Sequence, residues 1–255
     1  MRRFLAAAVA LCWCAAAQAQ SPAEADRYAA CMELARAAPA DGLREANAWL
    51  GEKETVPGRH CRAAALSGLG RTQDAADALQ ELGANLEKDD PAMAAGLYRQ
   101  AAMVQLEAGR LDEAEELQER GLKLAPDSVE LLMDRALLLG AREDYAAALK
   151  VLDHARALAP ARADLLVLTA SAHRLLGQTD RAEESVAAAL ALEPDNPAAL
   201  LERGIMRRLD GDKEGARADW ERVRALAPAS PEAETAAANL KLLEAPAPIG
   251  AGGEP

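Results

Sequence analysis

The chain has 255 residues, of which 51% are hydrophobic and only 3% aromatic, and its formal net charge is −12. This composition favours closely packed helices and argues against a β-sandwich, whose strands are typically rich in aromatic and β-branched residues. The acidic balance argues against binding to nucleic acid or to anionic lipid headgroups, because like charges repel.

The first 19 residues have the three parts of a secretory signal peptide. Arg2 and Arg3 supply the charged start, residues 4–17 are apolar, and Ala17-Gln18-Ala19 is a cleavage site of the small-x-small type. The apolar stretch is too short to cross a bilayer comfortably. We therefore expect cleavage after Ala19 and a periplasmic or secreted protein with no membrane span after cleavage.

Two alternatives for this segment stay open. Cys12 and Cys14 suggest a lipid-modified N-terminus, although Leu11 and Trp13 stand where that modification pattern needs a small residue. The other alternative is a signal that is not cleaved and acts as a membrane anchor.

Residues 22–90 predict divergent helical repeats. A first helical pair over 22–52 is interrupted at 38–42, where proline and glycine occur. A second pair over 59–85 turns at 69–75. The next helix is expected to begin at Pro91, because an aspartate precedes it as a cap and proline is favoured at the first helical position.

Beyond residue 91 the sequence repeats with a period of 34 residues. The repeat is visible in prolines, in small residues after a turn and in leucines, at Pro126, Pro160, Pro194, Pro228, Ala114, Ala148, Ala182, Ala216, Leu124, Leu158, Leu192 and Leu226. Glycine occupies the turn at Gly109, Gly177 and Gly211, where positive φ is needed, and Glu143 is the exception. A fixed period of this length indicates stacked helical hairpins that bury their apolar faces against one another.

These segments resemble the tetratricopeptide repeat. The resemblance is carried by residues 106–114 (Leu-Glu-Ala-Gly-Arg-Leu-Asp-Glu-Ala) with their ending at 122–126, and by 175–182 with their ending at 190–194. It implies an all-α, right-handed superhelical solenoid of antiparallel helix pairs. The sequence departs from the family at the large residue of the second helix, which is usually aromatic and is here Gln118, Leu152, Val186 and Trp220.

The repeat period sets the expected domain boundaries. We expect a signal peptide over 1–19, divergent repeats over 22–90, four repeats within 91–230, a capping helix over 231–244 and a disordered tail over 245–255. The four repeats are expected at 95–128, 129–162, 163–196 and 197–230.

The exported chain would keep two cysteines, Cys31 and Cys61, which lie 30 residues apart. An even count in an oxidising compartment favours a disulfide bond. The spacing is close to the repeat period, so the two thiols can face each other on first helices that pack side by side. Two buried free thiols are the alternative.

No pattern in the sequence indicates catalysis, a cofactor or a metal. The three histidines, His60, His154 and His173, have no partner at metal-ligand spacing apart from the adjacent Cys61, and adjacent helical residues point about 100° apart. We therefore expect a protein that is not an enzyme.

In tetratricopeptide repeats the first helix of each pair lines a concave groove, and the resemblance carries this over to matching positions here. The groove residues are then pairs four apart on one helical stripe, with two arginines further along, at Arg99, Met103, Met133, Leu137, Val167, Ser171, Arg174, Leu201, Ile205 and Arg208. Since most of the paired positions are apolar, we expect the groove to capture an apolar segment of a partner protein.

The function expected from these observations is a non-catalytic scaffold or adaptor in the bacterial periplasm. A chaperone-like holder of exported client proteins, for example in cytochrome c or envelope-complex assembly, is the alternative. A third possibility is a subunit or regulator of a cell-wall or polysaccharide enzyme.

Overall fold

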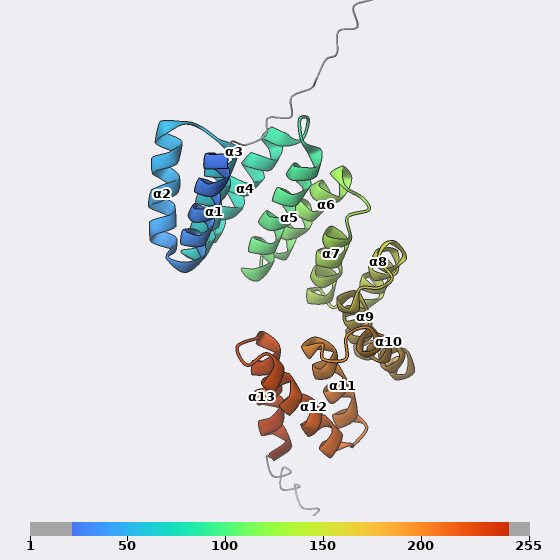
Figure 1. The fold of residues 1–255 in the computed structure, drawn as a ribbon. Coiled ribbons are helices and arrows are strands. Elements are labelled where there is room, and N and C mark those ends of the chain that lie inside the picture. Colours follow the sequence, from blue (N-terminus) through green and yellow to red (C-terminus); the bar gives the residue numbers. More distant parts are fainter. Residues whose placement is uncertain (1–21, 245–255) are drawn as a thin grey trace, which may run out of the picture. The chain divides into compact units, whose positions relative to one another are not determined.

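The computed structural model describes residues 22–244, and this part of the chain contains thirteen helices and no strand (Figure 1). The all-α fold predicted from the sequence is therefore confirmed. The expected signal peptide and the expected tail lie outside the described residues. The chain forms two compact units that divide after Gly70, here called the N-terminal unit (22–70) and the C-terminal unit (71–244).

The N-terminal unit consists of α1 (Pro22–Ala37), α2 (Pro39–Glu52) and α3 (Val56–Gly68), each of which packs against the other two. Pro39 starts α2 at a position where its missing N–H costs nothing. Thr55 caps α3 by accepting a hydrogen bond from the Gly58 N–H at 3.1 Å. The unit ends inside the segment 59–85 that the sequence suggested as one helical pair, because α3 packs on α1 and α2.

A disulfide bond joins Cys31 in α1 to Cys61 in α3, as the spacing of the two cysteines predicted. Their Cα atoms are 6.1 Å apart, and both residues are fully buried. They share a core with Ala46 and Trp49 of α2. The bond therefore links the two helices that flank this core.

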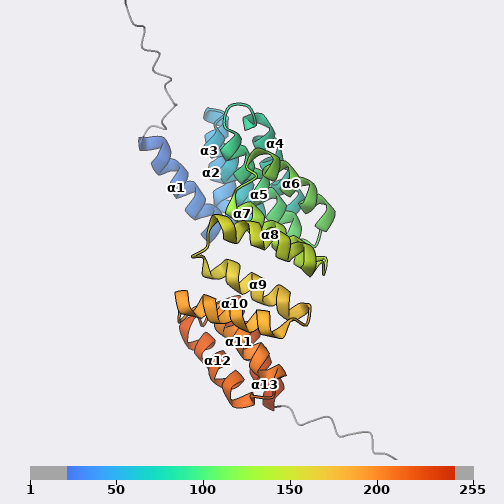
Figure 2. The same ribbon diagram turned by 90° about the vertical axis from the view of Figure 1, so that its right-hand side faces the viewer.

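The C-terminal unit contains ten helices, and consecutive helices lie side by side in both views (Figures 1 and 2). Their bounds are α4 (Thr72–Leu86), α5 (Pro91–Glu107), α6 (Leu111–Leu124), α7 (Val129–Ala141), α8 (Tyr145–Leu158), α9 (Ala163–Leu175), α10 (Thr179–Leu192), α11 (Pro197–Leu209), α12 (Lys213–Leu226) and α13 (Pro231–Glu244). Helices α5, α7, α9 and α11 are the first helices of four pairs, and α6, α8, α10 and α12 are the second helices.

The repeated prolines and glycines act as the sequence indicated. The second helices end at Leu124, Leu158, Leu192 and Leu226, two residues before each proline, because proline cannot continue a helix. The turn residues Gly109, Gly177 and Gly211 have φ values of 73°, 71° and 89°. Glu143 occupies the same turn position with a φ of 61°. It adopts the left-handed backbone conformation although its Cβ disfavours it.

The seam between the two helices of a pair is filled by one small and one large residue. In the last pair the small residue is Gly204, and the fully buried Trp220 lies directly against it. The indole N–H of Trp220 donates to the Leu201 carbonyl at 3.2 Å, so the polar atom of this buried ring has a partner. The two preceding pairs have Ala136 with Leu152 and Ala170 with Val186 at these positions. The largest side chain, Trp220, thus lies opposite the smallest residue, Gly204.

The first pair departs most from this pattern. Gln118 takes the position of the large residue and is fully buried. Its side-chain N–H donates to the Asp134 carbonyl at 3.0 Å, while its Oε1 has no hydrogen-bond partner. Half of this amide is therefore satisfied and half is not.

The residue just after α4, Glu87, takes part in a polar contact that involves three helices. The carboxylate of Glu87, just after α4, accepts hydrogen bonds from the Tyr98 hydroxyl at 2.5 Å and from Arg120 at 2.8 Å. The Arg120 guanidinium lies over the Tyr98 ring, 4.3 Å from its centroid. Where the later repeats have a proline, this one has a polar contact that joins α4, α5 and α6.

Candidate functional site

The residues predicted to line the groove lie on neighbouring helices of the C-terminal unit. Helix α5 contacts α7, α7 contacts α9, and α9 contacts α11. The helices that carry the stripe residues are therefore neighbours, and these ten residues are here called the first-helix face. Val167 is buried, and Leu137 and Arg208 are exposed. The other seven are half-buried: Arg99, Met103, Met133, Ser171, Arg174, Leu201 and Ile205.

Val167 does not lie on an open wall. It is 8% exposed and packs in a core cluster with Leu166 of α9 and with Ala189 and Ala199 of the following helices. Its side chain fills the seam of the third repeat and is covered. Leu201 and Ile205 are partly covered in the same way, because they pack against a core to which α13 contributes Ala236 and Leu240.

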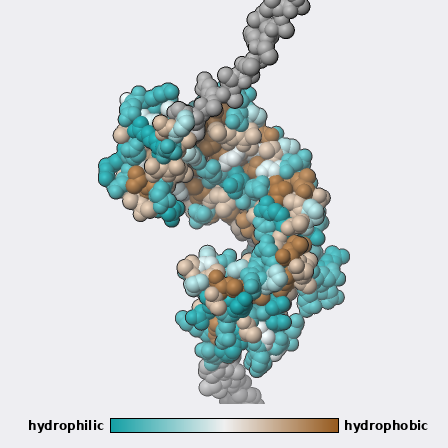
Figure 3. All heavy atoms as spheres, viewed as in Figure 1, coloured by the Kyte–Doolittle hydropathy of each residue, from teal (hydrophilic) through white to brown (hydrophobic). Residues whose placement is uncertain are grey.

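An apolar pocket of about 230 Å³ opens between α7, α8 and α9. Two predicted groove residues, Leu137 and Ser171, line it. Sequence reasoning missed Tyr145, Leu168 and Leu175, which complete its wall, because Tyr145 belongs to a second helix and the other two are outside the chosen stripe. No charged residue lines this pocket. In Figure 3 hydrophobic patches over α7 to α9 are separated by hydrophilic surface.

Two of the three arginines predicted for the groove, Arg99 and Arg174, are held by carboxylates of the next repeat. Arg99 of α5 donates to Asp134 of α7 at 3.2 Å, and Arg174 of α9 forms an ion pair with Glu202 of α11. Both carboxylates are about 5% exposed. These pairs connect successive first helices and leave neither arginine as an isolated cation.

Burial raises the pKa of Asp134 above its usual value, and the nearby Arg99 opposes that shift. A third connection joins Arg162, just before α9, to Glu130 of α7 at 2.9 Å. The guanidinium of Arg162 also contacts Asp164 at 2.6 Å. Arg99, Arg162 and Arg174 are thus each paired with carboxylates of the protein.

The histidines have ordinary structural contacts. His60 shares a 2.6 Å hydrogen bond with Tyr28, His154 contacts Asp127 at 3.0 Å, and His173 contacts Gln178 at 2.7 Å. Across residues 22–244, no group of three His, Cys, Asp or Glu side chains is arranged to hold a metal ion. No helix in the same range is long and apolar enough to cross a membrane.

Comparison with known proteins identifies the repeat. Residues 95–128 match the tetratricopeptide repeat, and these are the residues of the first of the four repeats expected from the 34-residue period. No protein of curated function matches the sequence.

Several solved structures share the fold. A tetratricopeptide repeat protein from Parabacteroides merdae is 17% identical with a TM-score of 0.67, over 86% of this chain and 84% of that one. A thermophilic repeat protein from Thermus thermophilus is 23% identical with a TM-score of 0.59, over 73% of this chain and 100% of that one. The Cut9–Hcn1 hetero-tetramer of the APC/C matches with 14% identity and a TM-score of 0.60, over 86% of this chain and 45% of that one.

Proposed function

We propose that this chain, a tetratricopeptide repeat protein, is a non-catalytic adaptor that binds a segment of a partner protein on its first-helix face. Proteins with this fold generally mediate protein–protein interaction. The proposal names the face on which such an interaction takes place here.

The observation that carries the proposal is the uncharged pocket between α7, α8 and α9. Leu137 and Leu175 at this pocket are 37% and 48% exposed. Covering apolar surface stabilises a complex by roughly 25 cal/mol per Å², so a partner side chain seated here would gain free energy on binding. No charged residue lines this pocket, and it therefore selects for shape and apolar contact.

We further propose that the protein works in the periplasm. Two features support this location: the signal-like segment 1–19 and the disulfide between Cys31 and Cys61, since such bonds persist in oxidising compartments. Cell fractionation with N-terminal sequencing of the mature protein tests the location. Recovery in the cytoplasm with Met1 retained would contradict it.

Site-specific photo-crosslinking in the native host tests the binding face. A photoreactive amino acid replaces Leu137, and the matched control replaces Leu158, which is 43% exposed on the second helix α8 and outside the pocket. We expect a defined crosslinked partner from position 137 and none from 158. Many unrelated clients at position 137 would instead favour a holder of exported chains. Equal crosslinking from both positions would contradict the proposed face.

A further inference from the structure

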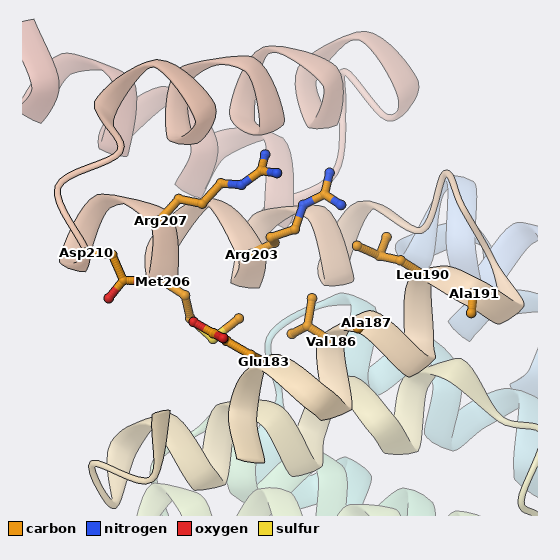
Figure 4. A pocket seen from close by; sticks show the side chains of 9 residues that line it. All are labelled: Glu183, Val186, Ala187, Leu190, Ala191, Arg203, Met206, Arg207 and Asp210. Carbon is orange, nitrogen blue, oxygen red and sulfur yellow. The ribbon is translucent and has the colours of Figure 1, made fainter. Parts of the chain in front are cut away.

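A second and larger pocket, of about 480 Å³, lies between α10 and α11. Val186 of α10 and Met206 of α11 are almost completely buried in one core cluster, against which Leu190 packs, so they form the floor of the pocket (Figure 4). The residues of α11 that line it are centred about half a turn of the helix away from Leu201, Ile205 and Arg208, at about 100° per residue. This pocket is therefore separate from the first-helix face and does not depend on the function proposed for that face.

The two arginines that line this pocket are already paired with a carboxylate of the protein. Arg203 holds Asp219 of α12 with two hydrogen bonds of 2.9 and 2.7 Å, and Arg207 donates to the same carboxylate at 2.8 Å. Asp219 is 4% exposed, and its hydrogen bonds raise the pKa of Arg203. Figure 4 shows both guanidinium groups directed away from Val186, so the arginines contribute mainly their aliphatic stems to the pocket wall.

The two carboxylates that line the pocket have no charged or hydrogen-bonding partner among residues 22–244. Glu183 of α10 and Asp210 of α11 are exposed, and neither side chain has a hydrogen bond or ion pair within residues 22–244. Figure 4 places both of them at one end of the pocket and Leu190 with Ala191 at the other. The pocket is thus apolar along its length and negatively charged at one end.

Two of the exposed side chains of α10 at the pocket are small. Ala187 and Ala191 line the pocket and are exposed. In the preceding repeat the position of Ala187 is Asp153, and the position of Leu190 is Arg156. Alanine and leucine at these places remove two charged side chains, and the alanine also leaves room that a longer side chain would fill.

We infer that the α10–α11 pocket binds a basic amphipathic peptide segment of a partner. The segment would place a large apolar side chain against Ala187, Leu190 and Ala191, over the buried Val186 and Met206. It would place a lysine or arginine near Glu183 and Asp210. Charge complementarity fixes the direction of the segment, since the only unpaired charges at the pocket are the two carboxylates at one end.

Binding of designed probe peptides to the full chain tests this inference. The basic probe is a fluorescein-labelled amphipathic helix with leucines on one face and lysines at one end, and the acidic probe has glutamates in place of the lysines. Fluorescence anisotropy at low ionic strength should show the basic probe binding at least about fivefold more tightly, and added salt should reduce that preference.

Two variants and their matched controls locate the site. Ala187→Leu fills the pocket and should weaken the basic probe about tenfold, whereas Ala188→Leu changes an exposed alanine of the same helix that does not line it. Glu183→Lys should reverse the preference between the two probes, whereas Glu184→Lys should leave it in place. Circular dichroism before each titration checks that the helices are intact.

Three results would each overturn the inference. The first is that neither probe binds the wild-type chain, and the second is that both bind equally well. The third is that each control variant weakens the basic probe as much as its pocket counterpart.

Discussion

Arg99 in α5 donates a hydrogen bond of 3.2 Å to Asp134 in α7, across the interface between the first two repeats. Asp134 is almost completely buried, whereas the side chain of Arg99 is 37% exposed. The carbonyl oxygen of the same Asp134 accepts a hydrogen bond from the buried Gln118 of α6. One residue of α7 therefore receives polar contacts from both helices of the preceding pair.

Replacing Arg99 by methionine should destabilise the protein, because it leaves the Asp134 carboxylate buried without its cation. Discounting for the solvent exposure of Arg99, we expect a loss of about 1–2 kcal/mol in the free energy of unfolding. Asp134→Asn in the same chain should recover most of that loss. Urea denaturation of the two single variants and the double variant measures the coupling, and strictly additive effects would contradict it.

The Arg99→Met variant should also depend on pH in a defined direction. Burial raises the pKa of Asp134 in the folded state, so the folded protein binds this proton more tightly than the unfolded chain does. The stability that the protonated Asp134 carboxyl contributes is therefore lost as the pH rises from the usual aspartate pKa through the raised pKa of the folded state. Without Arg99 the loss should grow, and the variant should be most destabilised relative to wild type at neutral pH. A destabilisation that increases on acidification would contradict this assignment.

Gly204 and Trp220 should behave as a coupled pair. A Cβ added at Gly204 would lie 2.4 Å from the Trp220 Nε1, so Gly204→Ala should cost about 1–3 kcal/mol of stability through overpacking. In Gly204→Ala with Trp220→Leu the last pair acquires the Ala136–Leu152 combination of the second repeat. Thermal unfolding should show that the double variant loses less than the sum of the single losses.

Glu143 should be replaceable by glycine with a gain in stability. Its φ of 61° lies in the left-handed region, which costs a non-glycine residue roughly 1 kcal/mol, and the other repeats have glycine at this turn position. The matched control is Gly177→Ala, which should lose a similar amount. If Glu143→Gly lowered the unfolding midpoint in urea, the strain assigned to this turn would be wrong.

Tyr98 should make the protein sensitive to alkaline pH. Burial and the hydrogen bond to Glu87 raise its pKa to about 12. The unfolded chain loses this proton near the ordinary value of about 10, so stability should fall as pH rises from about 10 towards 12. Tyr98→Phe should remove this part of the pH dependence. Identical alkaline slopes for the two proteins would show that Tyr98 does not contribute.

The disulfide should stabilise the N-terminal unit. It closes a loop with a sequence separation of 30 residues, which in the chain-entropy model is worth roughly 3–4 kcal/mol. The double variant Cys31→Ser with Cys61→Ser should therefore unfold at lower urea concentration than the oxidised wild type. Reduced wild type provides the control, and an unchanged midpoint after reduction would contradict the prediction.

The sequence by itself determined the helical repeats, because helix ends and turns depend on local chemistry. Proline cannot continue a helix, glycine adopts positive φ without strain, and both recur with one period. Cys31 and Cys61 are 30 residues apart, which is close to this period and predicted that they would face each other, and the structure joins them.

Only the tertiary structure decided which side chains meet between repeats. Asp134 and Glu202 lie two periods apart, yet their arginines come from different repeat positions, 35 residues earlier for Arg99 and 28 residues earlier for Arg174. Val167 has the sequence position of a groove residue and is nevertheless covered. The α10–α11 pocket has alanine at position 187, where the other three repeats have Glu119, Asp153 and Glu221. Such features arise from the sizes and charges of residues on different helices, which a periodic pattern along one chain does not contain.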